Sequence, residues 1–182
     1  TFLPRFFFSF IFIFIVRKIF YEFVFGKNKF NESNYSDRTS IHIHVNCLDM
    51  TLSQVATVLL IYQTFETLLF DFVGDDRSKN IFCTPLNECA TTFGVCEILA
   101  KGNTAPISSW PKYTAFNMAP IGSQGTIEFR HMSGTYDVTK IVRWLRIIGR
   151  IFAYAKKIDY QTVKNMIVKL NTTSEYHQIL QS

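Results

Sequence analysis

Two short segments of strictly alternating residues constrain the fold more than any other feature of the sequence. Residues 40–46 read SIHIHVN and residues 125–132 read GTIEFRHM. Alternation of apolar and polar residues over four to eight positions predicts a β-strand with one face buried and one face open. If the two strands pair, their polar faces form one surface. That surface carries His42, His44, Asn46, Glu128 and Arg130.

The polar face of this predicted strand pair has a specific chemistry. Side chains two residues apart on a strand point the same way. His42 and His44 therefore lie on one face of the first strand, and Glu128 and Arg130 lie on one face of the second. Imidazole nitrogens and carboxylates bind divalent cations, while a guanidinium clamps two phosphate oxygens at once. The pattern therefore predicts a site for a divalent cation and a phosphate group.

Helices are expected around these strands. Thr51 and Gln54 have the spacing of a capping box, and apolar residues recur with helical period from Leu52 to Phe72, where Gly74 ends the pattern. A second helix is predicted from Asp137 to about Lys157 and a third over residues 160–170. Residues 75–120 are expected to be irregular, apart from a short helix around 86–90. The predicted fold class is α+β, with an antiparallel sheet flanked by helices in a single domain of residues 1–182.

Composition narrows the class of protein. The chain has 182 residues, of which 48% are hydrophobic and 18% are charged, so it can bury a core. Its formal net charge of +5 suits an anionic small substrate such as a nucleotide. Lys and Arg form no run longer than a pair, so nucleic acid is not expected as a partner. Frequent Phe, Ile, Asn and Lys are typical of an AT-rich genome.

The cysteines and the N-terminal segment indicate a cytoplasmic protein. Four cysteines without a C-x-x-C pair are interpreted as reduced thiols, in preference to a metal site of Cys83, Cys89 and Cys96. The apolar run of residues 6–16 is too short to span a bilayer and is followed by Arg17 and Lys18. Residues 1–26 are predicted to form an apolar segment that docks on another part of the protein or on a partner. Membrane association through residues 6–25 is the alternative.

Both strand motifs resemble those of a known family. SIHIHVN resembles the G-M-H-x-H strand of glutamine synthetases, and TIEFRHM resembles their I-E-x-R strand. The amidoligase family of phages and bacteria, which shares that fold, is similar over about residues 20–158. The resemblance is carried by Ser40 to Asn46, Glu66, Arg77, Asn80, Cys83, Tyr113, Asn117, Thr126 to Arg130, Gly134, Thr135, Asp137 and Trp144.

The resemblance implies an ATP-dependent carboxylate–amine ligase with a glutamine-synthetase-like sheet, which joins its substrates through an acyl phosphate. Mg²⁺ or Mn²⁺ would be bound by His42 and Glu128, and Arg130 would stabilise the transferred phosphoryl group. The resemblance assigns ATP contacts to His44, Asn46, Asn80 and Arg77, with a catalytic role for Arg77 as well. It places Lys112, Tyr113 and Asn117 on the side of the amino-acid or peptide substrate.

This chain departs from the family pattern at two points. Lys112 stands where the family has Arg, and the chain contains no E-x-E strand, which supplies further acidic metal ligands in enzymes of this fold. We therefore expect the chain to correspond to a C-terminal portion, with the acidic ligands supplied by an upstream segment or a partner chain. A non-catalytic structural or assembly module in a larger complex is the alternative to a ligase. H-x-H alone would also allow a cupin, but a cupin needs a Glu shortly after the second His, and here Asp49 is the only acidic residue nearby.

Several of these residues also have simpler interpretations. Glu66 can be an ordinary solvated or hydrogen-bonded carboxylate, and Arg77 can pair with Asp75 or Asp76. Structural roles are expected for three further residues: His131 opposite Arg130, Asp137 as a helix N-cap and Trp144 in the core.

Overall fold

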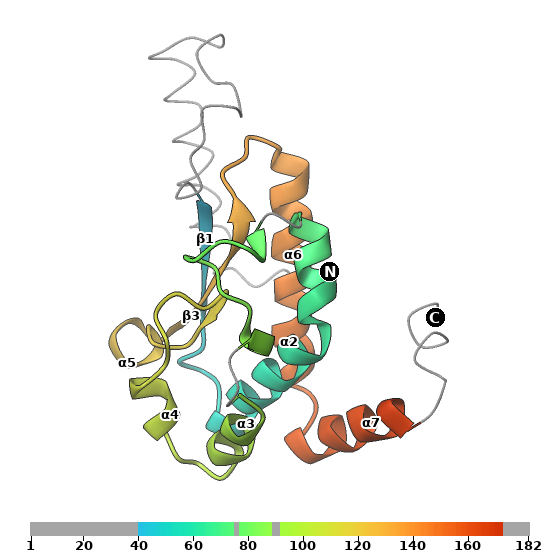
Figure 1. The fold of residues 1–182 in the computed structure, drawn as a ribbon. Helices are drawn as coiled ribbons and strands as arrows, with labels where there is room; N and C mark the ends of the chain where they lie inside the picture. Colours follow the sequence, from blue (N-terminus) through green and yellow to red (C-terminus); the bar gives the residue numbers. More distant parts are fainter. Residues whose placement is uncertain (1–39, 75–76, 89–91, 173–182) are drawn as a thin grey trace, which may run out of the picture.

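A computed structural model describes residues 40–74, 77–88 and 92–172. Within these ranges the chain is an α+β fold, with helices against a small antiparallel sheet (Figure 1). The expected apolar docking segment 1–26, Asp75, Asp76 and Cys89 lie outside the described residues.

Among the described residues, the sheet has three strands in the order β1-β3-β2. The central strand β3 (Thr126–Ser133) pairs antiparallel with β1 (Ser40–Asn46) on one side and with the short β2 (Phe116–Asn117) on the other. The predicted pairing of the two alternating segments is thus confirmed, and His44 lies opposite Glu128 in the register.

A β-bulge interrupts the pairing of β1 with β3. Ile43 faces Phe129, whereas Ile41 faces Met132, so β3 contains one more residue than β1 over this interval. A bulge of this kind locally re-aims side chains. His131 is fully buried against the helices, whereas Arg130, its neighbour, reaches the Glu128 carboxylate on the open face.

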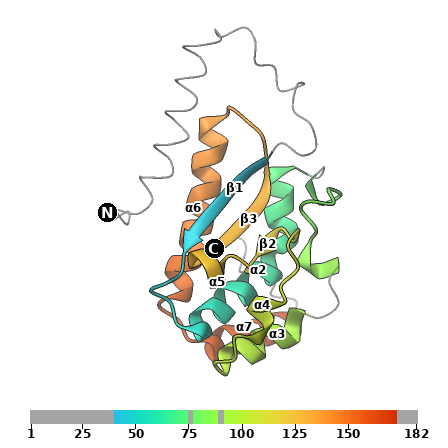
Figure 2. The same cartoon turned by 90° about the vertical axis from the view of Figure 1, so that its left-hand side faces the viewer.

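Two long helices, α2 (Leu52–Val73) and α6 (Val138–Ala155), lie behind one face of the sheet, so the other face is turned away from them (Figure 2). The predicted caps are present. Thr51 and Gln54 form the capping box of α2, and the Asp137 carboxylate accepts the Lys140 N–H at the start of α6. Trp144 is fully buried, as expected.

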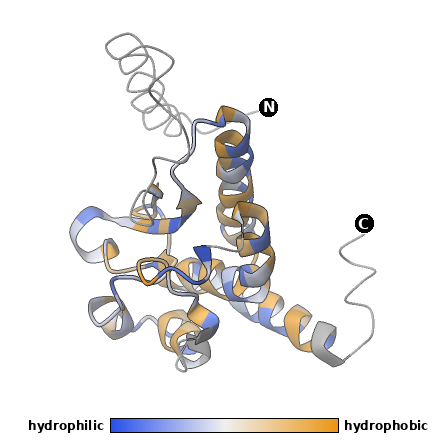
Figure 3. Ribbon diagram, turned by 45° about the horizontal axis from the view of Figure 1, so that its top comes forward, coloured by the Kyte–Doolittle hydropathy of each residue, from blue (hydrophilic) through white to orange (hydrophobic). Residues whose placement is uncertain are grey.

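The remaining elements pack around these two layers. Helices α3 (Thr92–Ala100) and α7 (Tyr160–Thr172) both contact α2, and three short helical turns complete the fold: η4 (Leu86–Glu88), α4 (Ala105–Ser108) and α5 (Ile121–Gln124). Hydrophobic residues recur along the helices around the centre of the molecule (Figure 3). Helix α2 is long and apolar enough to cross a membrane by length and composition, but most of it is buried inside the protein.

The prediction of an irregular segment over residues 75–120 was wrong in part. The short helix expected around 86–90 is a single turn, Leu86–Glu88, and α3 and β2 were not predicted. Helix α3 contains Gly94 and three β-branched residues, which lower helix propensity. Its buried Cys96 and Leu99 show that packing overrides that local preference. A two-residue strand is too short for any alternation to be visible.

A chain of buried hydrogen bonds joins α2 to the sheet and to the loop before α3. The Glu66 carboxylate accepts the Tyr62 hydroxyl at 2.6 Å and the backbone N–H groups of Leu86 and Asn87 at 2.7 and 2.8 Å. His131 Nε2 lies 2.8 Å from the Tyr62 oxygen. Glu66 is therefore a hydrogen-bonded structural carboxylate and not a solvated one, as one of the two simpler interpretations of the sequence predicted.

This chain of bonds fixes the proton on His131. A tyrosine hydroxyl has one hydrogen, and Tyr62 gives it to Glu66, so His131 Nε2 must donate to the Tyr62 oxygen. Nδ1 is then unprotonated, and it has no hydrogen-bond partner within the described residues. Burial, together with the positive charge of Arg77, lowers the pKa of His131 to about 3, which keeps the imidazole neutral.

We expect Glu66→Gln to lower the free energy of unfolding by about 2 kcal/mol or more, because the amide nitrogen cannot accept hydrogen bonds from the buried donors around it. Urea denaturation measures the loss. Glu97→Gln is the matched control, since Glu97 is only partly buried and is bonded to Lys164 and Tyr160 near the surface. Equal losses in the two variants would contradict a structural role for the buried carboxylate.

The buried imidazole also makes stability depend on pH. Between about pH 6.5 and pH 3 the unfolded chain binds a proton at His131 that the folded chain excludes, so acid favours unfolding by up to about 1.4 kcal/mol per pH unit. His131→Gln should flatten the profile in this range. Tyr62→Phe, which keeps the buried imidazole, should lower stability and leave the slope in place. An unchanged slope in His131→Gln would show that other groups cause it.

Candidate functional site

The predicted site residues meet on the sheet face that points away from α2 and α6, where β1 and β3 lie in front of the helices in Figure 2. The centre of the site is Glu128, in the middle of β3. Only 4% of its surface is exposed. Side chains from β1, β2 and β3 converge on it, so the sheet topology itself assembles the cluster.

Each oxygen of the Glu128 carboxylate has two partners. Oε1 lies 2.8 Å from His42 Nδ1 and 3.5 Å from His44 Nε2. Oε2 accepts hydrogen bonds of 2.8 Å from Asn117 Nδ2 and from Arg130 Nη2. We call these five residues the Glu128 cluster. The predicted convergence of two imidazoles, a carboxylate and a guanidinium is confirmed.

The electrostatics of the cluster favour an ionised carboxylate. Burial alone would raise the pKa of Glu128 by disfavouring its charge. Hydrogen bonds from His42, His44 and Asn117 and the positive charge of Arg130 outweigh burial, so the pKa lies well below its usual value. Glu128 is therefore ionised at neutral pH, with the positive charge of Arg130 and the other donors fixed around it.

Hydroxyl groups orient both imidazoles. Ser40 Oγ lies 2.8 Å from His42 Nε2, and Thr126 Oγ1 lies 3.0 Å from His44 Nδ1. In the neutral form, each ring then carries its proton on the nitrogen that faces Glu128 and accepts the hydroxyl hydrogen on the other. Sequence reasoning missed Ser40 and Thr126. Their positions two residues before His42 and Glu128, on the same strand faces, were the available signal.

Two predicted substrate residues flank Arg130. The Arg130 guanidinium lies 5.9 Å from the centre of the Tyr113 ring, and Lys112 Nζ lies 5.5 Å from it. Tyr113 is 45% exposed, so it presents a partly open aromatic ring between two cations beside the buried carboxylate. Arg130 Nε is buried without a hydrogen-bond partner in the described residues, so one donor of this guanidinium is unused there.

Asn117, the third predicted substrate residue, has a different environment from the other two. It is 2% exposed, donates to Glu128 Oε2, and accepts the Ala119 N–H at 3.0 Å. Its described contacts thus position the carboxylate. The prediction that it also contacts a substrate stays a prediction.

Three further predicted residues are not in the Glu128 cluster. Arg77 is buried and donates from Nε to the His131 carbonyl at 3.0 Å and from Nη2 to the Arg130 carbonyl at 2.9 Å. Arg77 thus binds the part of β3 that lies beyond the two residues, Glu128 and Phe129, with which β2 pairs. Asn80 accepts the Phe82 N–H in the following turn, and the exposed Asn46 accepts the Leu48 N–H just after β1. Their assigned ATP contacts, and the catalytic role of Arg77, stay predictions.

The donor types around Glu128 fit a divalent cation, but they do not form a complete site. Two ligands bound at right angles about 2.1 Å from one ion are about 3 Å apart, which is close to the separations of Glu128 Oε1 from the two imidazole nitrogens. In the described part of the chain, however, no group of three or more His, Cys, Asp or Glu side chains is arranged to hold a metal ion. The cluster is a closed hydrogen-bonded network, in which a cation would replace protons on the rings.

A pocket lies elsewhere, at the start of α6. It has a volume of about 240 Å³ and is lined by Phe72, Asp137, Thr139, Lys140 and Arg143. These residues belong to the helical layer, so the pocket is on the side of the sheet away from the Glu128 cluster. The position of this pocket gives no support to a single site that combines it with the Glu128 cluster.

Comparisons with known proteins leave the family open. No family model, no curated protein and no solved structure matches this chain. What is shown is the α+β fold with a three-stranded antiparallel sheet and the cluster on its open face.

Proposed function

We propose that this chain forms part of an ATP-dependent carboxylate–amine ligase with a glutamine-synthetase-like sheet. The observation that carries the proposal is the Glu128 cluster, in which an ionised carboxylate is surrounded by two imidazoles and a guanidinium on an open sheet face. These groups occur together in sites that bind a cation and a phosphate, since each binds a different part of a metal–nucleotide complex.

The reaction needs such groups because a carboxylate does not condense with an amine unaided. A carboxylate oxygen of the substrate attacks the γ-phosphorus of ATP, and the bond to the ADP oxygen breaks. The amine then attacks the acyl carbon, phosphate leaves with the electron pair of the C–O bond, and the amine gives up a proton. A bound Mg²⁺ or Mn²⁺ would offset the negative charge of the two anions that meet.

The chain's own residues have separate tasks in this proposal. Glu128 and His42 would hold the cation, with His44 beside the phosphates. Arg130, whose Nε lacks a partner within the described residues, would bind the oxygens of the transferred phosphoryl group. Asn117 would hold Glu128 in place, and the half-exposed Tyr113 would face the substrate. Further oxygen ligands would come from the nucleotide phosphates and from acidic residues of an upstream segment or a partner chain.

A non-catalytic assembly module is the second candidate, and one observation favours it. Both carboxylate oxygens of Glu128 already have two partners each, so the buried carboxylate is satisfied without any ligand. A buried polar network of this kind can have a purely structural role, which here would be to fix the pairing of β1, β2 and β3. The two candidates differ in whether the cluster binds a cation.

Titration of Mg-ATP into the protein by calorimetry, and of Mn²⁺ by electron paramagnetic resonance, separates the two candidates. For a ligase we expect saturable binding of both. His42→Ala and Glu128→Gln should each weaken it at least about tenfold, because each removes a proposed ligand of the cation.

Asp49→Asn is the control, since Asp49 is exposed and pairs with Lys156 away from the sheet. Circular dichroism identifies any variant that fails to fold. The His42 side chain is 37% exposed, so His42→Ala should disturb folding less than Glu128→Gln. Absence of binding at saturating Mn²⁺, or binding that both variants leave intact, would favour the assembly module.

A further inference from the structure

The outer face of α6 is strongly basic, and nothing in the proposed ligase reaction uses it. Residues 138–158 contain six basic residues and no acidic one. Of these, Arg143, Arg146 and Arg150 are exposed and recur at intervals of three and four residues, so they form one line along the helix. The exposed Lys157 follows just after the helix ends. We call these four residues the basic stripe.

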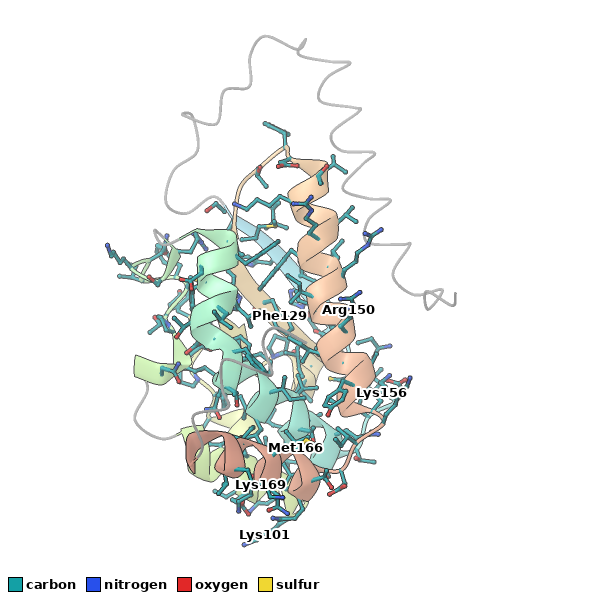
Figure 4. The ribbon with its side chains drawn as sticks, turned by 90° about the vertical axis from the view of Figure 1, so that its right-hand side faces the viewer. Lys101, Phe129, Arg150, Lys156, Met166 and Lys169 are labelled. Atoms are coloured by element: carbon teal, nitrogen blue, oxygen red, sulfur yellow. The ribbon has the colours of Figure 1, made fainter. Side chains whose placement is uncertain are left out.

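The basic stripe is electrostatically unbalanced. Lys140 and Lys156 of the same region are occupied, the first with the Val73 carbonyl at the end of α2 and the second with Asp49. No ion pair joins a residue of the basic stripe to a carboxylate in the part of the chain that the structure describes. Figure 4 labels Arg150 on α6 and Lys156 just beyond its end. A row of unpaired positive charges on a rigid helix favours an anionic partner.

The form of the stripe points to a chain of phosphates. Arg143 and Arg150 are seven residues apart, so the arginines extend over about 10 Å of helix. A guanidinium binds phosphate oxygens in pairs, which makes arginine the preferred residue for contacts with a nucleic-acid backbone. No nucleic-acid partner was expected from the sequence, because residues three and four apart in the sequence do not form a run of basic residues. The helix brings them together on one face.

A membrane surface fits less well. A helix that lies on a bilayer inserts an apolar face beside its basic one. In α6 that apolar face is already used, since Trp144, Ile148 and Phe152 are buried in the core. Tyr154, which is 48% exposed, is the one large aromatic ring that α6 exposes. A single ring also gives no platform on which successive unpaired bases could stack, which favours a duplex over a single strand.

We propose that the basic stripe of α6 binds the phosphate backbone of a nucleic-acid duplex without reading its sequence. The inference is independent of the ligase proposal, because α6 lies on the other side of the sheet from the Glu128 cluster (Figures 1 and 2). Four phosphate contacts predict that the logarithm of the binding constant falls with the logarithm of salt concentration with a slope of about −3 to −4.

Fluorescence anisotropy with two duplex DNAs of unrelated sequence, over roughly 50 to 200 mM salt, tests the proposal. We expect both duplexes to bind alike. The double variant Arg146→Gln/Arg150→Gln should bind at least about tenfold more weakly and reduce the slope by about 2. Lys79→Gln/Lys101→Gln removes the same charge from exposed residues outside α6, and should leave the slope unchanged.

Three results would overturn the proposal. The first is absence of duplex binding at the lowest salt, and the second is an equal loss in both double variants. The third is stronger arginine-dependent binding to vesicles of anionic lipid, or to poly-glutamate, than to either duplex, which would assign the stripe to a membrane or to an acidic protein.

Discussion

The buried charge of Glu128 is the interaction on which the open face of the sheet depends. A carboxylate that is almost fully removed from water remains ionised only if fixed donors replace its hydration, and here four side chains do so. These donors come from β1, β2 and β3, so the charge at the centre also connects the strands. Loss of any one donor leaves the carboxylate less stable and its neighbours less well placed.

The two faces of β3 carry two different hydrogen-bonded groups of side chains. On the helical side, His131 belongs to a buried chain of hydrogen bonds that passes through Tyr62 to Glu66 and onward to the loop at Leu86. On the open side, the neighbouring Arg130 reaches Glu128 and Tyr113. Arg77 contributes to both, because it binds the carbonyl groups of these two residues from the edge of the strand. A buried scaffold thus supports a cluster whose two imidazoles are partly exposed.

The alternation of two segments was enough to predict β1, β3 and their polar face, since a period of two has one interpretation at this length. Capping residues and helical spacing likewise predicted α2 and α6. Helix α3 was not predicted, because its stability comes from packing of Cys96 and Leu99 and not from its own sequence preference. The positioning roles of Asn117, Ser40 and Thr126 depend on contacts across strands, and the arginines of α6 become a stripe only in the folded helix.

The central claim is that the Glu128 cluster binds a divalent cation together with a nucleotide, and a crystal structure with Mn²⁺ and a non-hydrolysable ATP analogue tests it most directly. Anomalous scattering locates the metal without reference to the surrounding side chains. The account predicts an Mn²⁺ peak about 2.1 to 2.2 Å from Glu128 Oε1, with an imidazole nitrogen of His42 as a further ligand and a phosphate oxygen beside Arg130. A cluster that keeps its hydrogen bonds, with Mn²⁺ absent or bound elsewhere, would contradict it.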